Sequence, residues 1–380
     1  VAPDSFKESL SAADAAAAIQ RGVLRAAPAA GVDLCPIADG GEGTVAAMLA
    51  ATNGKAMSTT VHGPFDTTVD AAWGMLGNTE LPTTVIEMAA ASGLPLVPMD
   101  QRDPTRTSTR GTGELIKAAL DAGAHRIVVG IGGSATTDGG TGMAQALGVQ
   151  LLDADGRPIT QPMTGGLLQQ INRIDISGID PRLAKTQVTA ACDVTNPLTG
   201  PRGAAAVYGP QKGATPEQVR ELDAGLAHLA TLLREQLHID VEQLPGSGAA
   251  GGLGGGLVAF LHAKLMPGID LVLDAIDFNN RVAGASLCLT GEGKLDGQSL
   301  SGKACLGVAQ RAAAQGVPTI ALVGCVGEDA ARTLEAGLCG YHAIGEGLPV
   351  AESIRRAGEL LEQTAARVVA EFMATGVAPH

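Results

Sequence analysis

The chain has 380 residues, a length that favours two domains, and its 26 Lys and Arg against 39 Asp and Glu give a net charge of −13. Aromatic residues are 2% of the sequence and no basic cluster stands out, so the composition argues against a nucleic-acid-binding protein, which needs a positive surface and often stacking rings. No apolar run of about 18 residues and no basic leader followed by an apolar segment is present, so we expect no membrane partner and a cytoplasmic location.

Most predicted elements repeat one pattern, in which a short apolar run ends in Gly, Asp or Ser and an alanine-rich helix follows. Helices are expected at 12–26, where Ser11 and Asp14 fit a capping box, and at 307–315. The apolar runs lie, in chain order, at residues 34–37, 126–131, 188–192, 287–290 and 319–323. Strands that alternate with helices predict parallel sheets covered on both faces.

Residues 59–73 differ, because apolar and polar residues alternate on both sides of a turn, which predicts an antiparallel hairpin. We therefore predict an α/β protein of two domains. A parallel-sheet domain is formed from both chain ends, residues 1–58 and 284–380, and a mixed-sheet α/β domain, residues 59–283, is inserted between them.

The six cysteines form no CxxC pair and mostly lie in apolar runs. We expect them to be reduced and buried. No grouping of Cys and His has the spacing of a zinc site.

Five polar loops follow predicted strands, and in such folds ligands bind beyond the carboxyl ends of the strands. The loops are residues 4–7, 39–44, 134–138, 193–197 and 292–296. Together they hold carboxylates, two lysines and many backbone amides. This set suits phosphoryl transfer, because amides and cations hold phosphates while carboxylates bind magnesium or accept a hydroxyl proton. One such carboxylate alone is more often a cap or turn residue, but five loops at one sheet edge favour a site.

Two stretches match nucleotide-binding motifs in their spacing. Residues 297–303 have the glycines and lysine of a P-loop, but Ala304 replaces the hydroxyl that would hold magnesium and no strand abuts the first glycine, so we reject this match. Residues 246–251 have the dinucleotide-binding spacing without a clear strand before them. These glycines favour a helix N-terminus that closely approaches another backbone or a phosphate.

Longer motifs run in order along the chain. They are APDSFKESLS (2–11), PIADGGEGT (36–44), IEMAAASGL (86–94), GTGELI (111–116), GIGGSATTDGG (130–140), ACDVTNPL (191–198), GPQKGA (209–214), GAAGG (248–252) and TGEGKLD (290–296). Together they resemble the bacterial glycerate kinase family, of the glycerate 2-kinase type that serves glyoxylate and galactarate catabolism. The sequence departs from the family at its start, since the family's first strand begins several residues earlier, and at Lys294, where Arg is also familiar.

The resemblance implies ATP-dependent phosphorylation of D-glycerate with Mg²⁺, giving 2-phosphoglycerate, with 3-phosphoglycerate left open. It also implies a flavodoxin-like parallel domain from the two chain ends, an inserted mixed α/β domain, and an active site in the cleft between them.

Roles for single residues follow from chemistry rather than from the resemblance. We expect Asp193 to accept the hydroxyl proton, Lys7 and Lys294 to neutralise the phosphates, and Glu292 or Asp296 to bind Mg²⁺. Two further candidates bind the glycerate carboxylate, because a planar guanidinium matches it bidentately: Arg110 and Arg202. The predicted substrate- and phosphate-binding set also contains Ser5, Asp39, Gly40, Gly41, Gly132, Gly133, Ser134, Thr136, Gly251 and Gly252.

Two other functions stay open at this point. One is an NAD(P)-dependent oxidoreductase that uses the glycines of residues 246–251, and the other is a non-catalytic protein that binds sugar acids. A homodimer is also left open.

Overall fold

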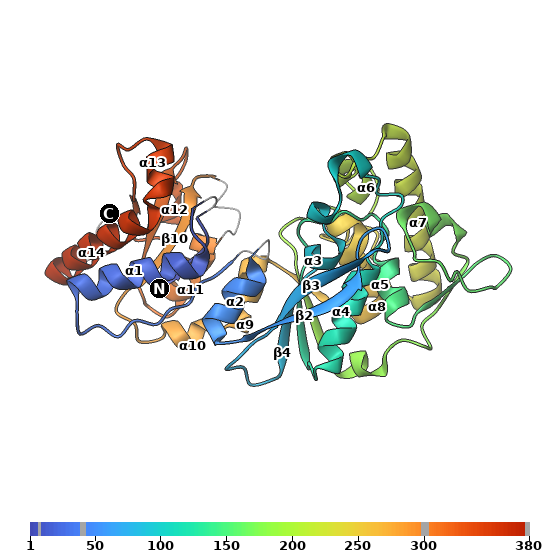
Figure 1. Ribbon diagram of the computed structural model, residues 1–380, viewed down its shortest axis with the longest axis horizontal. Helices are drawn as coiled ribbons and strands as arrows, with labels where there is room; N and C mark the ends of the chain where they lie inside the picture. Colours follow the sequence, from blue (N-terminus) through green and yellow to red (C-terminus); the bar gives the residue numbers. More distant parts are fainter. Residues whose placement is uncertain (7–8, 39–42, 298–303, 377–380) are drawn as a thin grey trace.

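The chain forms two lobes, each around its own β-sheet (Figure 1). The computed structural model describes residues 1–380 apart from 7–8, 39–42, 298–303 and 377–380. The end lobe is built around a four-stranded sheet and contains the first strand and the last helix, whereas the inserted lobe is built around a six-stranded sheet. The predicted fold class is confirmed, with a parallel sheet made from both chain ends and a separate mixed sheet between them.

The four strands of the end lobe are all parallel, in the order β1-β10-β11-β12. They are β1 (Ala2–Pro3), β10 (Cys288–Leu295), β11 (Thr319–Val326) and β12 (Gly340–Ala343). Its helices are α1 (Ala12–Ala26), α11 (Ala304–Ala314), α12 (Arg332–Glu335), α13 (Val350–Arg355) and α14 (Ala357–Thr375). Helix α1 begins where predicted, because the Ser11 hydroxyl accepts a hydrogen bond from the Asp14 amide at 3.1 Å. Its apolar face packs on α14 over Ile19 and Leu361.

The six-stranded sheet of the inserted lobe has the order β2-β3-β4-β5-β8-β9. Its strands are β2 (Lys55–His62), β3 (Thr68–Met75), β4 (Thr83–Glu87), β5 (Arg126–Gly130), β8 (Gln187–Ala191) and β9 (Lys264–Met266). Strands β2 and β3 form the predicted antiparallel hairpin, and β4, β5, β8 and β9 are parallel. The expected boundary at residues 58 and 59 falls inside β2, whose whole length pairs with β3.

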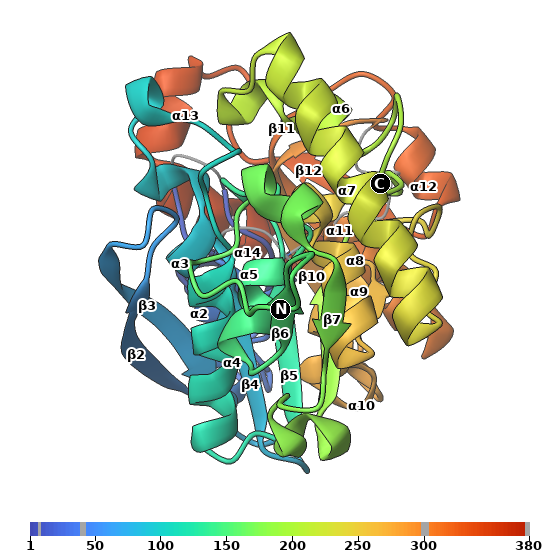
Figure 2. The same cartoon turned by 90° about the vertical axis from the view of Figure 1, so that its right-hand side faces the viewer.

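Helices cover the six-stranded sheet, and Figure 2 shows α4 and α7 in front of it. The helices of this lobe are α3 (Ala89–Ser92), α4 (Arg110–Asp121), α5 (Thr141–Ala146), α6 (Ala204–Tyr208), α7 (Pro216–Leu237) and α8 (Leu253–Leu261). A small antiparallel pair, β6 (Gln150–Leu152) with β7 (Arg173–Asp175), lies beside them. Short 3₁₀ helices occur at Leu94–Leu96, Met99–Gln101, Gly165–Gln170, Pro181–Lys185, Pro210–Lys212 and Ala249–Gly252. No helix in the described part of the chain is both long and apolar enough to cross a membrane.

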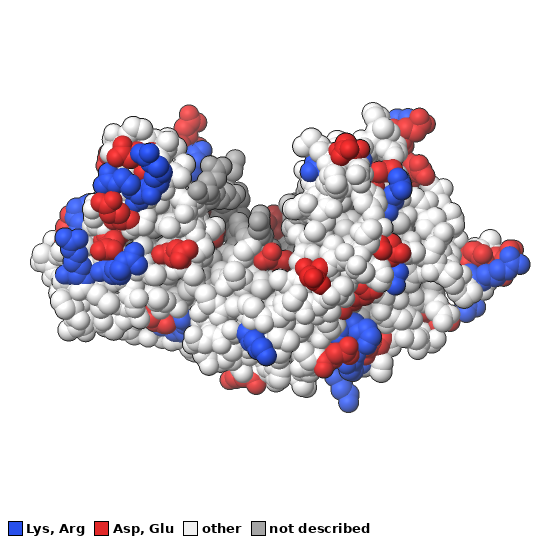
Figure 3. Space-filling model, viewed as in Figure 1, with Lys and Arg blue, Asp and Glu red and all other residues white. Residues whose placement is uncertain are grey.

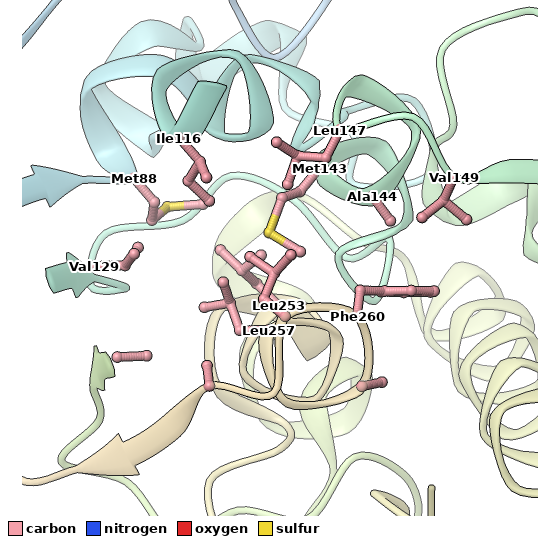
Figure 4. Packing of buried hydrophobic residues seen from close by; sticks show 14 of the residues in the cluster. Met88, Ile116, Val129, Met143, Ala144, Leu147, Val149, Leu253, Leu257 and Phe260 are labelled. Atoms are coloured by element: carbon pink, nitrogen blue, oxygen red, sulfur yellow. The ribbon is translucent and has the colours of Figure 1, made fainter. Parts of the chain in front are cut away.

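The core of the inserted lobe fixes the helices that follow its strands. In β5, Ile127 and Val129 point to one face and Val128 to the other, the alternation expected of a strand buried on both sides. Figure 4 shows Met143 of α5 pointing toward Leu253 and Leu257 of α8. All three side chains are buried. This packing holds the start of α5, and therefore the glycine-rich loop before it, against α8.

A layer of three helices joins the lobes: α2 (Thr44–Thr52), α9 (Gly268–Ala275) and α10 (Phe278–Val282). One apolar cluster contains Val85 and Val128 of the six-stranded sheet, Ile269 of α9, and Cys288 and Val308 of the end lobe. Above this layer the surface is hollowed between the two lobes (Figure 3). Helix α3, which follows β4, stands at the inserted-lobe wall of this hollow.

Candidate active site

The four parallel strands of the inserted lobe, β4, β5, β8 and β9, end at the same level of the sheet. In the register of the sheet, Glu87 lies opposite Gly130, Gly130 opposite Ala191, and Ala191 opposite Met266. The residues that follow these strand ends therefore emerge in one row along the carboxyl edge of the sheet, where α/β folds bind ligands. The row brings together the glycine-rich loop 131–140, the Asp193 loop and the start of α9.

Asp193 is an exposed carboxylate in this row, two residues beyond β8. Its Oδ1 accepts a hydrogen bond from the Gly268 amide at 2.8 Å, at the first residue of α9. This contact fixes the direction of the side chain and places negative charge at a helix N-terminus, where it is stabilised. The geometry suits both a capping role and a proton acceptor held at a set angle.

Glu87 is a second carboxylate of the row, and no role for it was predicted from the sequence. It ends β4, and its Oε1 accepts a hydrogen bond from the Val45 amide at 2.8 Å, in the first turn of α2. It thus ties the sheet edge to the helix that follows residues 39–42. The sequence could have indicated Glu87, because it is the charged residue that follows the buried residues of the strand Thr83–Glu87.

The loop 131–140 exposes only its tip. Gly132 and Gly133 are exposed, whereas Ser134 and Thr136 are buried, with exposed fractions of 8% and 0%. The Gly133 carbonyl accepts from the Leu94 amide at 2.8 Å, and the Ala135 amide donates to the Ser92 carbonyl at 3.0 Å. The amides of the two tip glycines are therefore the part of this loop that an anion can reach.

Asp138, at the other end of the loop, is a structural carboxylate. It is fully buried and accepts hydrogen bonds from the Thr109 amide and hydroxyl, both at 2.8 Å, and from the Gly140 and Gly142 amides at 3.1 and 3.2 Å. These donors lie at the starts of α4 and α5, so one side chain caps two helices. Burial raises the pKa of Asp138, and the hydrogen bonds from Thr109, Gly140 and Gly142 oppose that rise.

The glycines of residues 246–252 let two backbones meet. No strand is described between α7 and this segment, so the dinucleotide-binding unit that its spacing suggests is missing. A Cβ at Gly248 would lie 2.1 Å from the Pro197 carbonyl oxygen, and one at Gly251 would lie 1.9 Å from that of Thr136. The sequence indicated that these glycines closely approach either another backbone or a phosphate. The structure shows another backbone beside Gly248 and Gly251. Gly251 and Gly252 are both buried.

Lys212 is a buried cation that no sequence argument singled out. Its exposed fraction is 2%, and its Nζ donates to the Thr136 carbonyl at 2.6 Å. Lysine is rarely buried, and a lysine in a Gly-Pro-Gln-Lys-Gly turn is expected to be exposed. The sequence therefore did not indicate the burial of Lys212.

The end lobe contributes a second group of polar residues at the carboxyl edge of its sheet. The Asp4 amide donates to the Gly291 carbonyl at 2.8 Å, and the Asp4 carboxylate accepts from the Ser5 amide at 2.6 Å. Burial raises the pKa of the Cys305 thiol, and the charges of Glu292 and Asp4 raise it further, so both carboxylates lie near that thiol. Lys294 is exposed and pairs with Asp296 at 2.9 Å. Four predicted site residues lie outside the described residues: Lys7, Asp39, Gly40 and Gly41.

The predicted metal ligands provide hard oxygen donors. Glu292 is a buried carboxylate and Asp296 a mostly buried one, with exposed fractions of 7% for the residue and 16% for the side chain. In the described ranges, no three His, Cys, Asp or Glu side chains gather into a group that could hold a metal ion. Either carboxylate alone would fit Mg²⁺, which commonly takes one or two protein carboxylates together with phosphate oxygens and water, although Asp296 already pairs with Lys294.

The two predicted arginines differ in their surroundings. Arg110 pairs with Asp66 at 2.9 Å and with Glu114 at 3.1 Å, so its guanidinium is already engaged by two carboxylates. Arg202 is exposed and forms no ion pair with any described residue. Its carbonyl accepts from the Asn196 side chain at 2.8 Å, which ties it to the Asp193 loop.

Comparison with known proteins gives one consistent result along the whole chain. The sequence model described as "Glycerate kinase family" matches residues 1–373. The chain is 49% identical over 373 residues to a glycerate kinase of Bacillus subtilis (strain 168), covering 98% of this chain and 97% of that protein. It is 49% identical over 338 residues to the glycerate 2-kinase of Escherichia coli (strain K12), covering 89% and 88%. A crystal structure described as a glycerate kinase 2 from Salmonella typhimurium LT2 superposes with a TM-score of 0.88 at 46% identity, covering 99% of this chain and 98% of that one.

Proposed function

The chain belongs to the glycerate kinase family, and from this premise we propose that it transfers the γ-phosphoryl group of ATP to a hydroxyl of D-glycerate, giving 2-phosphoglycerate. The observation that carries the proposal is the identity of 49% to a glycerate 2-kinase over 338 residues, a span too long to lie within either lobe alone. We place the reaction in the cytoplasm, in the catabolism of small organic acids.

Asp193 is the proposed proton acceptor. As the glycerate oxygen bonds to the γ-phosphorus and the bond from that phosphorus to the β,γ-bridging oxygen breaks, the hydroxyl proton passes to the Asp193 carboxylate and ADP leaves. The Gly268 amide holds Oδ1, so the side chain has a fixed aim before the substrate arrives.

Backbone amides and cations hold the phosphates in this proposal. The exposed Gly132 and Gly133 amides bind phosphoryl or carboxylate oxygens, and Lys294 with Lys7 neutralises the phosphate charge. Glu292 or Asp296 would hold Mg²⁺, which would supply positive charge to the phosphate oxygens when bound. Between the two arginines, Arg202 is the better candidate for the glycerate carboxylate, because Arg110 would first have to leave Asp66 and Glu114.

A coupled assay tests the activity and its product. Purified protein with D-glycerate, ATP and Mg²⁺ should form ADP, measured with pyruvate kinase and lactate dehydrogenase. The product should then be consumed by enolase directly. A product that enolase accepts only after phosphoglycerate mutase is added would be 3-phosphoglycerate and would contradict the proposed position. ADP formation that does not depend on D-glycerate would contradict the substrate.

Asp193→Asn tests the proton acceptor without removing the contact to α9, because the Asn oxygen can still accept from the Gly268 amide. We expect turnover to fall about 100-fold or more while ATP binding, measured by calorimetry, is retained. Asp155→Asn, in an exposed turn, is the matched control and should behave as wild type. Turnover of Asp193→Asn within a few-fold of wild type would remove Asp193 from the mechanism, and rescue of the variant by added Mg²⁺ would move it to a metal-binding role.

A further inference from the structure

Lys212 holds the glycine-rich loop from inside the lobe. It ends a 3₁₀ turn, Pro210–Lys212, and its ammonium reaches 76 residues back in the sequence to the Thr136 carbonyl. Among the described residues this is the only hydrogen bond of that ammonium, which has three donors. A fully buried ammonium with one acceptor is costly to the fold, and the nearby Asp138 carboxylate offsets part of this cost.

The Thr136 carbonyl is held from two sides. Lys212 donates to it, and the Gly251 backbone packs so closely on it that no other residue type would fit there. The loop's own hydroxyls do not share this task, because Thr136 Oγ1 and Thr137 Oγ1 have no hydrogen-bond partner in the described part of the chain. The carbonyl stands three residues beyond Gly133, the exposed tip of the loop. It anchors the loop on the side of α5, while the Leu94 amide on the Gly133 carbonyl and the Ala135 amide on the Ser92 carbonyl anchor it beside α3.

We propose that Lys212 is a positioning residue, whose ammonium fixes the Thr136 carbonyl and thereby holds the Gly132 and Gly133 amides in the arrangement that binds a substrate anion. The inference rests on the proposed function, since it takes a phosphoryl or carboxylate group as the ligand of the tip. Lys212 itself touches no substrate in this scheme.

The burial of Lys212 makes its hydrogen bond to the Thr136 carbonyl sensitive to pH. Burial lowers the pKa of Lys212 to about 7, and the nearby Asp138 carboxylate opposes this shift. Arg102 is another charged group beside the turn, and its guanidinium donates to the Gln211 carbonyl at 3.4 Å. Above neutral pH the ammonium becomes an amine, and the charge-assisted bond to Thr136 becomes a weaker neutral one. Substrate binding should weaken as the pH rises through this range.

Stability gives a readout that is independent of activity. The unfolded state keeps the lysine proton up to about pH 10, whereas the folded state loses it near neutral pH. Between these values the unfolded state binds more protons, so this group makes the fold more stable as the pH rises. The free energy of unfolding of Lys212→Met should not show this increase, because methionine has no proton to lose. The gain in stability of the variant over wild type should therefore be greatest at low pH.

The experiment compares wild type, Lys212→Met, Lys212→Arg and the surface control Lys117→Met between pH 6 and 9. We expect Lys212→Met to lose about 100-fold in kcat/KM at pH 6.5, mainly through the KM of one substrate, and to lose the pH dependence near neutrality. Lys212→Arg, which keeps a charge that does not titrate, should recover part of kcat/KM without that pH step. Lys117→Met should match wild type, because among the described residues Lys117 forms an ion pair with Asp121 alone, on an exposed surface at 3.4 Å.

A measurement on the wild-type protein guards against a variant that fails to fold. In protein labelled with ¹³C at the lysine ε-carbons, one of the eight lysine signals should titrate near pH 7. If Lys212→Met keeps the wild-type KM, the inference is wrong; if all eight signals titrate above about pH 9, the expected pH dependence is wrong. If the protein forms no ADP with D-glycerate but the signal still titrates near neutrality, the proposed function fails while the buried titration of Lys212 stands.

Discussion

Asp138→Asn is the sharpest test of how the glycine-rich loop is built. The carboxylate has four donors: Oδ2 accepts from the Thr109 amide, the Thr109 hydroxyl and the Gly142 amide, and Oδ1 accepts from the Gly140 amide. An Asn oxygen can replace Oδ2, but its NH₂ group would then face the Gly140 N–H. One buried donor loses its acceptor, and three hydrogen bonds lose their charge.

The magnitude follows from these four contacts. An unsatisfied buried donor costs about 1–3 kcal/mol, and each of the three bonds weakens by roughly 1 kcal/mol when its acceptor becomes neutral. Burying an amide instead of a carboxylate offsets part of this loss. We expect a net loss of roughly 2–4 kcal/mol in the free energy of unfolding, which is a large share of the stability of an ordinary domain.

Urea unfolding followed by circular dichroism measures this loss. The control is Asp240→Asn, an exposed carboxylate with a single hydrogen bond, to the Glu242 amide at 3.1 Å, and it should stay within about 0.5 kcal/mol of wild type. If the two variants unfold at the same urea concentration, Asp138 does not cap the two helices as an ionised group, and the reasoning fails.

Three other outcomes are expected. Gly251→Ala should abolish stable folding or activity, because its Cβ would strike the Thr136 carbonyl at 1.9 Å, whereas Gly376→Ala, at a similar positive φ in open space, should cost only about 1–2 kcal/mol by thermal shift. Arg281 lowers the pKa of Asp33, so the stability that this pair adds is present above about pH 4 and is lost as the pH falls through the folded-state pKa. The unfolding midpoints of wild type and Asp33→Asn should therefore differ slightly at pH 7 and approach each other as the pH falls below about 4, and a gap that widens in acid would contradict this sign. All six cysteines are unpaired, but the expected burial is wrong for Cys325, which is exposed, and for the half-buried Cys192 and Cys339. A mild reductant should leave activity unchanged, and loss of activity together with a mass shift would reveal a disulfide.

The sequence was informative where a local pattern decides the structure. The Ser11 cap, the hairpin of β2 and β3, and the polar residues after β5 and β8 follow from short-range rules, and the structure has them. The expected strand at 34–37 is wrong: this run only follows the first strand through two amides that donate to Val1 and Pro3, and the polar loops are divided between two sheets rather than lying at one edge. The boundary at residues 58 and 59 was misplaced because an edge strand of the inserted lobe continues directly from α2.

Long-range contacts could not be inferred in this way. From the sequence, Asp138 looks like a ligand-binding residue in a polar loop. Its role as a cap of both α4 and α5 depends on the contact with Thr109, which lies 29 residues earlier in the chain. The burial of Lys212 depends on the Thr136 carbonyl 76 residues away, and general preferences place lysine outside. Glu87 could have been found, because the rule that selected Asp193 applies equally to the end of β4.

The pairing of β1 with β10 imposes an order on folding during synthesis. Ala2 lies beside Thr290, so the first strand leaves the ribosome long before its neighbour exists, a delay of roughly 15–60 s at ordinary rates of translation. All strands of the six-stranded sheet lie between Lys55 and Met266, so that sheet can close first. The apolar face of α1 cannot form its contacts with α14 until that helix, at residues 357–375, has been synthesised. The lobe that contains β1 is thus completed after the inserted lobe, and until α14 is made the apolar face of α1 is open to aggregation in the nascent chain.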